Sequence, residues 1–511
     1  MSDWASGYVT DIEYTYGYYP ELNPLRARLA LLRAGLVPPQ IRTACELAFG
    51  QGLAINFHAA ASSTEWWGTD FSPSQTKFAR DCAAAVRKDV HLYDEAFSEF
   101  CARRDLPDFD YIALHGIWSW ITLDNRAVIV DFIRRKLKVG GVLYVSYNTM
   151  PGWAAFAPMQ HLLLEHAKTM AARGRGVVSR FDAALEFAER MLAANSRYGQ
   201  ANPRVAERLK KIGEADPMYA THEYLCEEWR PSPVADMARS LEPAKVSFAC
   251  SAHFPDHVDA LNLTAEQQAL LADIPDPIFR ETTRDFMVNT QFRRDYWVKG
   301  PRRLSMLEQV EALRAHRVML TQPRPDVSLK VTGALAEAHL HEGVYAPILD
   351  ALADYQPKTI AELEQMLVRN NITLGLLAEA VIVLSGSTAM QPVQDAEVSR
   401  KAKPCSDRLN SYLMELARAS AEVGQLASPV TGGGVGVNRL EQLFLLTRAQ
   451  GRKQPAEWAQ AAWQLLQAQG QRIRKEGRRL ETAEENLTEL TRQAQTFAEK
   501  RVPILKALEI A

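Results

Sequence analysis

The strongest chemical signal in the sequence is the segment Ala44-Cys45-Glu46-Leu47-Ala48-Phe49-Gly50-Gln51-Gly52, in which a β-prone run enters a glycine-rich turn. Glycines leave the backbone of such a turn uncovered, so a ligand can lie against it without meeting a side chain. The following stretch, Leu53 to Ala61, reads as a helix whose first N–H groups are free to bind polar or anionic atoms. The pattern therefore predicts a ligand site at the turn.

Two cofactor classes compete for this turn. A dinucleotide site needs a third glycine, and that position is filled by the branched Ile55, which disfavours a pyrophosphate. An acidic residue, Asp70, closes a second predicted strand 24 positions after Glu46, near the interval of about 20 expected for a ribose-binding carboxylate. A carboxylate can accept both ribose hydroxyl protons. The competing interpretation of Asp70 is a cap of the helix that begins near Pro73.

The alternative class fits this turn better. Its residues resemble the E-x-G-x-G-x-G motif of class I S-adenosylmethionine-dependent methyltransferases, with Glu46, Ala48, Gly50 and Gly52 at the fixed positions. Ala48 departs from the first glycine of the motif but keeps the position small. The resemblance implies that S-adenosyl-L-methionine is the cofactor, that S-adenosyl-L-homocysteine is the product, and that Asp70 meets the ribose.

The same resemblance places further residues around the cofactor. The run Leu92-Tyr93-Asp94-Glu95-Ala96-Phe97 stands where the family presents an acid to the adenine amino group and an apolar neighbour to its ring. Asp94 is favoured over Glu95 for the acidic role. The cofactor-binding set is completed by Phe71, Asp94, Phe97 and His115.

The elements that must position these residues alternate between β-rich and helical segments. The β-rich runs are Thr43–Leu47, Trp66–Asp70, Val90–Tyr93, Asp110–His115 and Val142–Tyr147. Helical stretches such as Pro73–Val86 and Arg126–Leu137 separate them. This alternation is typical of a parallel sheet with helices on both faces. We predict an α/β fold, a doubly wound, Rossmann-like class I methyltransferase domain followed by helical and α+β domains.

Residues that follow the fourth and fifth strands should lie at the carboxyl edge of the sheet, where doubly wound folds bind ligands. The candidates for catalysis there are Tyr147, Asn148 and His115, none of them assigned as a base. The candidates for substrate contact are Tyr14, Tyr16, Trp118, Tyr147 and Trp153. Packing is the competing interpretation for the tryptophans. The tyrosines of the N-terminal arm, Tyr19 included, either pack or fold over the cofactor and stabilise its sulfonium.

Two segments narrow the resemblance. Asp110–Trp120 and Gly140–Trp153 resemble bacterial methyltransferases that carry a methyltransferase regulatory domain, and matching segments at Asp11–Tyr16, Thr221–Leu225 and Phe292–Gly300 extend the likeness over most of the chain. That group is similar to bacterial lysine methyltransferases that modify outer-membrane proteins. The resemblance implies a protein substrate methylated on lysine, and a homodimer.

The resemblance and the shifts in composition divide the chain into six parts. These are an N-terminal arm and helix (1–40), a catalytic domain (41–155), a helical segment suited to dimerisation (156–217), a regulatory-like region (218–304), a middle domain of winged-helix-like pattern (305–395) and a mostly helical C-terminal domain (396–511).

Composition limits the function classes. The 511 residues include 59 Lys+Arg against 61 Asp+Glu, which argues against nucleic acid as the main partner because phosphates need clustered cations. Six cysteines without a C-x-x-C pair indicate reduced thiols, and no metal site is expected. The N-terminus lacks a signal-peptide pattern and no run of about 18 apolar residues occurs. We expect a cytoplasmic protein that does not insert into membranes.

Two weaker signals and three functions stay open. The run Gly432–Gly436 lacks the Lys-Ser/Thr of a phosphate loop and predicts a hairpin or flexible turn. The acidic group Glu223, Glu227 and Glu228 either receives a substrate lysine or forms a solvated helix face, which is favoured. The protein methylates a protein lysine, methylates a small metabolite or cell-envelope precursor, or serves as a non-catalytic cofactor-binding scaffold.

Overall fold

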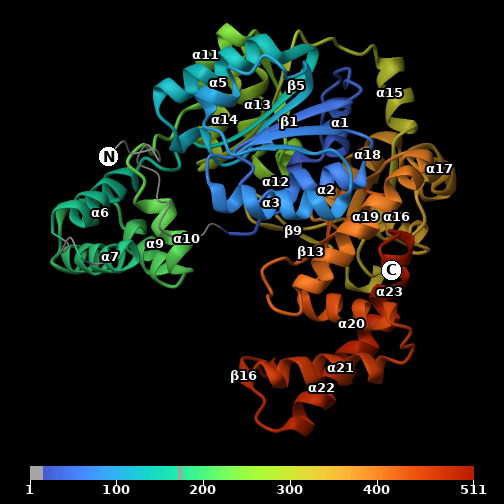
Figure 1. Cartoon of the computed structure of the whole chain (residues 1–511). Helices are drawn as coiled ribbons and strands as arrows, with labels where there is room; N and C mark the ends of the chain where they lie inside the picture. The colour runs from blue at the N-terminus through green and yellow to red at the C-terminus, as the bar shows by residue number, and fades with distance from the viewer. Residues whose placement is uncertain (1–14, 171–173, 175) are drawn as a thin grey trace.

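The protein is built around a seven-stranded sheet with the order β3-β2-β1-β4-β5-β7-β6 (Figure 1). A computed structural model describes residues 15–170, 174 and 176–511. The strands are β1 (Thr43–Leu47), β2 (Glu65–Thr69), β3 (His91–Tyr93), β4 (Phe109–Leu114), β5 (Leu137–Asn148), β6 (Val246–Ser251) and β7 (Phe292–Lys299). Neighbours are parallel from β3 to β5, and β7 is antiparallel to both β5 and β6. The predicted parallel strands are present, and β1 has its predicted bounds.

Helices cover both faces of the sheet, because successive side chains of a strand point to opposite faces. Along β1, Ala44 belongs to the core on one face and Cys45 to the core on the other. The first face packs against α1 (Pro24–Arg33), α2 (Leu53–Ala61) and α3 (Pro73–Val86). The second face packs against α4 (Phe97–Phe100), α5 (Leu123–Lys136) and α11 (Val234–Leu241). The doubly wound α/β fold is confirmed.

A helical lobe is inserted between the fifth strand and the last two. It stands to one side of the sheet in Figure 1 and contains α6 (Ala157–Thr169), α7 (Val177–Ala193), α8 (Arg197–Ala201), α9 (Arg204–Gly213) and α10 (Pro217–Tyr224). The chain then returns through α11 to β6, and reaches β7 by way of α12 (Asp259–Asn262), α13 (Ala265–Ala272) and α14 (Pro277–Val288). The region 218–304 therefore completes the sheet, with Val298 of β7 opposite Val142 of β5. The sequence predicts a separate domain for this region, apart from residues 41–155, because strand pairing across about 150 residues leaves no local sequence pattern.

The remaining chain forms two smaller parts. Residues after β7 give α15 (Met306–Arg314), β8 (Arg317–Leu320), β9 (Lys330–Thr332), β10 (Glu337–His339), α16 (Glu342–Ala351), β11 (Lys358–Thr359), α17 (Ile360–Met366), α18 (Leu374–Gly386) and β12 (Met390–Val393). The C-terminal part gives α19 (Ala396–Leu416), β13 (Gln425–Ser428), β14 (Gly433–Gly436), α20 (Arg439–Ala449), α21 (Pro455–Ala468), β15 (Arg474–Lys475), β16 (Arg478–Arg479), α22 (Ala483–Thr496) and α23 (Val502–Ala507). In the middle part, β8 lies between β11 and β12.

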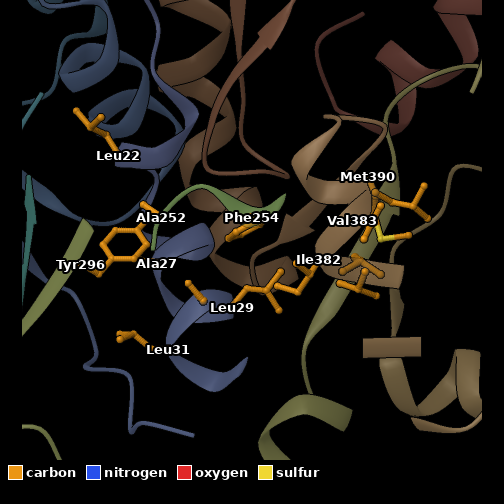
Figure 2. Close-up of a cluster of buried hydrophobic side chains, with 14 of the residues drawn as sticks. Leu22, Ala27, Leu29, Leu31, Ala252, Phe254, Tyr296, Ile382, Val383 and Met390 are labelled. Atoms are coloured by element: carbon orange, nitrogen blue, oxygen red, sulfur yellow. The ribbon is translucent and has the colours of Figure 1, made fainter. Parts of the chain in front are cut away.

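The core runs without a break from the sheet into both smaller parts. Figure 2 shows Leu29 of α1 between Tyr296 of β7 and Ile382 of α18. Every residue of α2 is buried, since one side packs on the sheet and the other, with Phe57, packs on the C-terminal part. The glycine-rich turn before α2 is thus supported from two directions.

Among the residues that the structure describes, none of the helices combines the length and the hydrophobicity needed to cross a bilayer.

Candidate functional site

The glycine-rich turn joins β1 to α2 through three left-handed residues. Ala48, Gly50 and Gly52 have φ angles of 57°, 58° and 71°. Gly52 is also required by packing, because an added Cβ would lie 2.4 Å from the Cβ of Ala79. At Gly50 an added Cβ would meet nothing closer than 3.9 Å, so its backbone lies open to a ligand. Ala48 carries a Cβ in a conformation that favours glycine, which is the residue the motif has there.

Asp70, directly after β2, holds this turn in place. Its Oδ2 accepts a hydrogen bond from the N–H of Gly50 at 2.9 Å, and its Oδ1 accepts one from the N–H of Ser72 at 2.9 Å. Burial raises the pKa of the Asp70 carboxyl to about 6, although both hydrogen bonds favour the ionised form. Each oxygen keeps a second lone pair for a ligand hydroxyl.

Glu46 is the most unusual group at the turn. Its side chain is 3% exposed, and its Oε2 has no hydrogen-bond partner among the described residues. Burial raises the pKa of Glu46 to about 8, and the nearby charge of Asp70 adds to this rise. A buried polar atom without a partner is rare and calls for a ligand or an ion to satisfy it.

His115, which follows β4, lies in a layer of aromatic rings with Tyr19 and Tyr144. Tyr19 stacks on its imidazole with ring centroids 3.7 Å apart, and Glu46 contributes to raising the pKa of the Tyr19 phenol above its usual value, after burial. The Nδ1 of His115 is 2.8 Å from the hydroxyl of Tyr144 and 3.3 Å from Oγ of Ser146. Burial lowers the pKa of His115 to about 4, so its imidazole is neutral at pH 7.

An ion pair next to His115 was not found from the sequence. Glu21 and Arg294, 273 positions apart, approach to 3.2 Å, and the hydroxyl of Tyr296 donates to the backbone oxygen of Glu21 at 2.6 Å. The charges of both pair members act on His115. Only the pairing of β7 with β5 brings Arg294 here, and nothing in its local sequence indicates a site residue.

Tyr147 points to the opposite face of the sheet. Its hydroxyl donates to Oδ2 of Asp295 at 2.7 Å, and Arg293 binds the same oxygen at 2.9 Å. Burial holds the pKa of Tyr147 well above its usual range. Residues 144 and 146, not 147, face His115, so Tyr147 is not grouped with that residue, and its contact with the acceptor or role in catalysis stays a prediction.

Asn148 ends β5 on the same face as Tyr144. Its backbone N–H donates to Oγ of Ser119 at 2.9 Å, and its carbonyl oxygen accepts from the N–H of Ser232 at 2.9 Å. These contacts fix the backbone at Asn148, a residue that is 4% exposed. Asn148 stays a candidate by position alone.

Trp118 and Trp153 occupy packing positions. Trp118 is 1% exposed in the core under α5, and Trp153 is 4% exposed in the helical lobe. The indole N–H of Trp153 donates to the carbonyl oxygen of Gln291 at 2.8 Å, and Arg208 lies over its ring. These positions match the packing interpretation, because large rings bury area wherever the core offers it, and contact of either tryptophan with a substrate stays a prediction.

The acids after β3 lie farther out. Asp94 is exposed and accepts from the guanidinium of Arg80 at 2.9 Å, while Glu95 pairs with Arg103 at 2.7 Å. Phe97 begins α4 and packs at the edge of the core. The role of Asp94 and Phe97 toward an adenine remains a proposal, as does that of Phe71, which lies partly exposed next to Asp70.

The tyrosines of the N-terminal arm follow the carboxyl edge of the sheet. Tyr16 meets the ring of Phe78 at 5.0 Å, and the hydroxyl of Tyr18 is 3.3 Å from Nε2 of His58. Tyr14 lies outside the described residues. The arm therefore packs against α3 and α2 and ends with Tyr19 on His115.

The acidic group at the end of the helical lobe divides into two kinds. Glu227 pairs with Lys168 at 2.9 Å and Glu228 with Arg230 at 3.0 Å, as on a solvated face. Glu223 has no ion pair in the described part of the chain, and burial raises its pKa to about 7. One turn before it on α10, Tyr219 has its pKa raised to about 12, mainly by burial, with Glu223 and Tyr19 among the smaller causes. Glu223 is half-buried and so differs from Glu227 and Glu228, which form exposed ion pairs.

Among residues 15–170, 174 and 176–511, no group of three or more His, Cys, Asp or Glu side chains could hold a metal ion. The six cysteines are free thiols, and five of them are buried.

Comparison with known sequences gives one family profile and several relatives. The profile, described as a predicted methyltransferase regulatory domain, matches residues 216–299, which include β6 and β7. The uncharacterized protein sll1526 of Synechocystis is 42% identical over 513 residues, covering 99% of this chain and 100% of the relative. The uncharacterized protein RP028 of Rickettsia prowazekii is 28% identical over 197 residues, covering 38% of this chain and 77% of the relative.

Comparison with solved structures shows the same fold along nearly the whole chain. The structure of PKMT2 from Rickettsia typhi in complex with AdoHcy matches with a TM-score of 0.70 at 16% identity, covering 98% of this chain and 100% of that one. A second structure of PKMT2 from the same organism matches with a TM-score of 0.68 at 15% identity, covering 96% and 99%. The inserted helical lobe and both smaller parts thus belong to a shared architecture.

Proposed function

Because the chain belongs to the family of class I S-adenosylmethionine-dependent methyltransferases with a methyltransferase regulatory domain, we propose that it transfers a methyl group to the ε-amine of a lysine in a protein. The observation that carries the proposal is the buried carboxyl of Glu46, whose Oε2 has no hydrogen-bond partner among the described residues, beside a left-handed turn that Asp70 holds in place. The likeness in fold to PKMT2, whose name abbreviates protein lysine methyltransferase, supports the proposal that the acceptor is lysine.

The residues at the turn fit S-adenosylmethionine. When bound, this cofactor supplies an electrophilic methyl group on a positively charged sulfonium, next to a second cation, its amino group. The free Oε2 of Glu46 would pair with the positively charged end of the cofactor that carries the sulfonium and the amino group. Asp70 would accept the ribose hydroxyls on its remaining lone pairs, and the open backbone at Gly50 would let the cofactor approach.

The acceptor amine needs a group that binds its ammonium form and takes its proton. His115, with a pKa of about 4, is too weak a base for that step and is suited to orienting neighbours instead. Glu223, whose pKa burial raises to about 7 against the opposing charge of Arg208, forms no ion pair among the described residues, and we propose that it pairs with a lysine ammonium and holds the proton.

The proposal also covers the setting in which the enzyme works. The sequence resemblance implies a homodimer in the cytoplasm, and we propose both. Light scattering of the purified protein tests the dimer, with a mass near twice 57.2 kDa expected.

The deciding experiment incubates the purified protein with methyl-labelled S-adenosylmethionine and separate protein and small-molecule extracts of the host. We expect label on lysine after digestion of the protein fraction, and none with the Asp70→Ala variant. Label confined to small molecules would contradict a protein acceptor. Absence of both cofactor binding and label would leave a non-catalytic scaffold.

A further inference from the structure

The C-terminal part carries a strongly basic hairpin, formed by β15 and β16. Residues 471–482 contain five cationic side chains against two acidic ones. A tight turn connects β15 to β16, with Glu476 and Gly477 at φ angles of 50° and 79°, the pattern of a rigid two-residue turn. Asn486 of α22 fixes the hairpin from below, because its Oδ1 accepts the N–H of Ile473 at 2.8 Å. The cationic side chains therefore project from a fixed backbone.

The two faces of this hairpin differ in how their charges are balanced. Lys475 and Arg478 face the same way as Ile473 and meet acids of α22, Glu489 at 3.3 Å and Glu485 at 3.9 Å. This face is neutralised within the molecule.

On the opposite face, Arg474 and Arg479 lie directly across from each other in the β15–β16 register. Like charges in that position repel and destabilise the pair. Neither guanidinium has an acidic partner in the part of the chain that the structure describes. Both side chains are exposed, so their two positive charges are available to an anion from outside.

These two arginines line a cavity of about 390 Å³ together with Arg439 and Arg472, and the apolar side of its lining includes Leu440 and Leu466. We call it the arginine cavity. The guanidinium of Arg439 binds only carbonyl and amide oxygens, among them the backbone oxygen of Ala417 at 2.7 Å. Arg472 alone has an acidic partner, Glu481. Three of the four guanidinium groups thus keep their charge unbalanced.

We propose that the arginine cavity binds an acidic, partly apolar segment of a polypeptide. Guanidinium groups bind carboxylates through two parallel hydrogen bonds, and the apolar side of the lining accepts the aliphatic side chains between them. The volume suits a few residues rather than a folded surface. The segment belongs to the protein substrate and anchors it at a distance from the lysine that is methylated. This role rests on the methyl transfer proposed above.

The place of the hairpin favours a segment of a long protein substrate. It lies at the outer end of the C-terminal part, away from the sheet, as Figure 1 shows for β16, α21 and α22. A site there reaches a long substrate and not the cofactor.

The first test measures binding without a methyl donor. The probe is a fluorescent pentapeptide of alternating glutamate and leucine, and the control peptide has glutamine in place of glutamate. We expect the glutamate peptide to bind, and the Arg474→Gln/Arg479→Gln variant to bind it at least about tenfold more weakly. The matched Lys475→Gln/Arg478→Gln variant changes the same charge on the neutralised face and should stay within about twofold.

Equal losses in the two double variants would overturn the proposal, as would equal binding of the two peptides. Inorganic pyrophosphate is the second probe. If pyrophosphate binds at the cavity and the peptide does not, the site takes phosphate and the peptide assignment fails. Thermal unfolding of each variant confirms that the hairpin is intact.

The second test uses methyl transfer to the protein extract. The Arg474→Gln/Arg479→Gln variant should raise the KM for the protein substrate at least about fivefold while its affinity for S-adenosylmethionine is unchanged. If the unaltered protein methylates no protein, the proposed function fails and the peptide-binding result still stands alone. If it methylates proteins and the variant is unimpaired, the cavity has no part in substrate binding.

Discussion

At the scale of single residues, Glu46 decides how the site responds to pH. Its pKa of about 8, well above the ordinary 4.5, means that the carboxyl group is mostly protonated at pH 7. Pairing with a cationic cofactor requires the ionised form, so binding lowers this pKa and releases a proton. We expect close to one proton to be released per cofactor at pH 7, and the affinity to rise as the pH increases from 6 to 8. Calorimetry in two buffers of different ionisation enthalpy measures the release.

The matched variant is Glu46→Gln, which keeps the shape and removes the charge. It should release no proton from this position and bind S-adenosylmethionine about tenfold more weakly or worse. A proton count near zero for the unaltered protein would contradict the role of Glu46.

Asp70 has a different task, because it holds the backbone of the turn. In Asp70→Ala the N–H groups of Gly50 and Ser72 lose a buried charged acceptor, and the free energy of unfolding should fall by about 1–3 kcal/mol. Cofactor affinity should fall at least about tenfold, measured by calorimetry. The control is Asp81→Asn on the solvated side of α3, where an exposed pair with Lys77 contributes little. Unchanged cofactor affinity in folded Asp70→Ala protein would remove Asp70 from the site.

At the scale of elements, the turn after β1 carries strain at Ala48. A side chain at a φ of 57° costs about 1–2 kcal/mol, which glycine avoids. Ala48→Gly should therefore raise the midpoint of thermal unfolding, while Ala54→Gly in the first turn of α2 should lower it, because glycine has a lower helix propensity than alanine and leaves the buried site unfilled. Differential scanning calorimetry compares the two variants. A lower midpoint for Ala48→Gly would show that the left-handed conformation is not the stable one.

The elements also show where sequence reasoning succeeds. The bounds of β1 and α3 follow from local patterns, since a short apolar run and a proline at the first helical position act within a few residues. Strands β6 and β7 join the sheet by pairing with strands that are distant in the sequence. The same pairing places Arg294 beside His115, which no local pattern indicates. The burial of Trp118 and the orientation of Tyr147 likewise follow from packing, which residue type alone does not fix.

At the scale of the whole molecule, the C-terminal part supports the N-terminal arm. The second glycine-rich run forms the β13–β14 hairpin, and Asn23 at the start of α1 donates to the carbonyl oxygen of Thr431 at 2.9 Å. The backbone at Gly433 lies so close to the arm that an added Cβ would be 2.4 Å from the hydroxyl of Tyr18. Because Tyr19 stacks on His115, residues more than 400 positions apart share in shaping the candidate site.

This coupling can be tested within one strand. Gly433→Ala should displace Tyr18, and through it Tyr19, so that the KM for S-adenosylmethionine rises at least about fivefold. Gly436→Ala places the same methyl group where nothing lies within 4 Å, and it should leave the KM unchanged. Steady-state kinetics gives both values, and thermal unfolding separates a local displacement from a general loss of stability. If both variants behave alike, the hairpin is only a structural support and the arm is positioned by the sheet, since the two substitutions differ solely in what the added carbon meets.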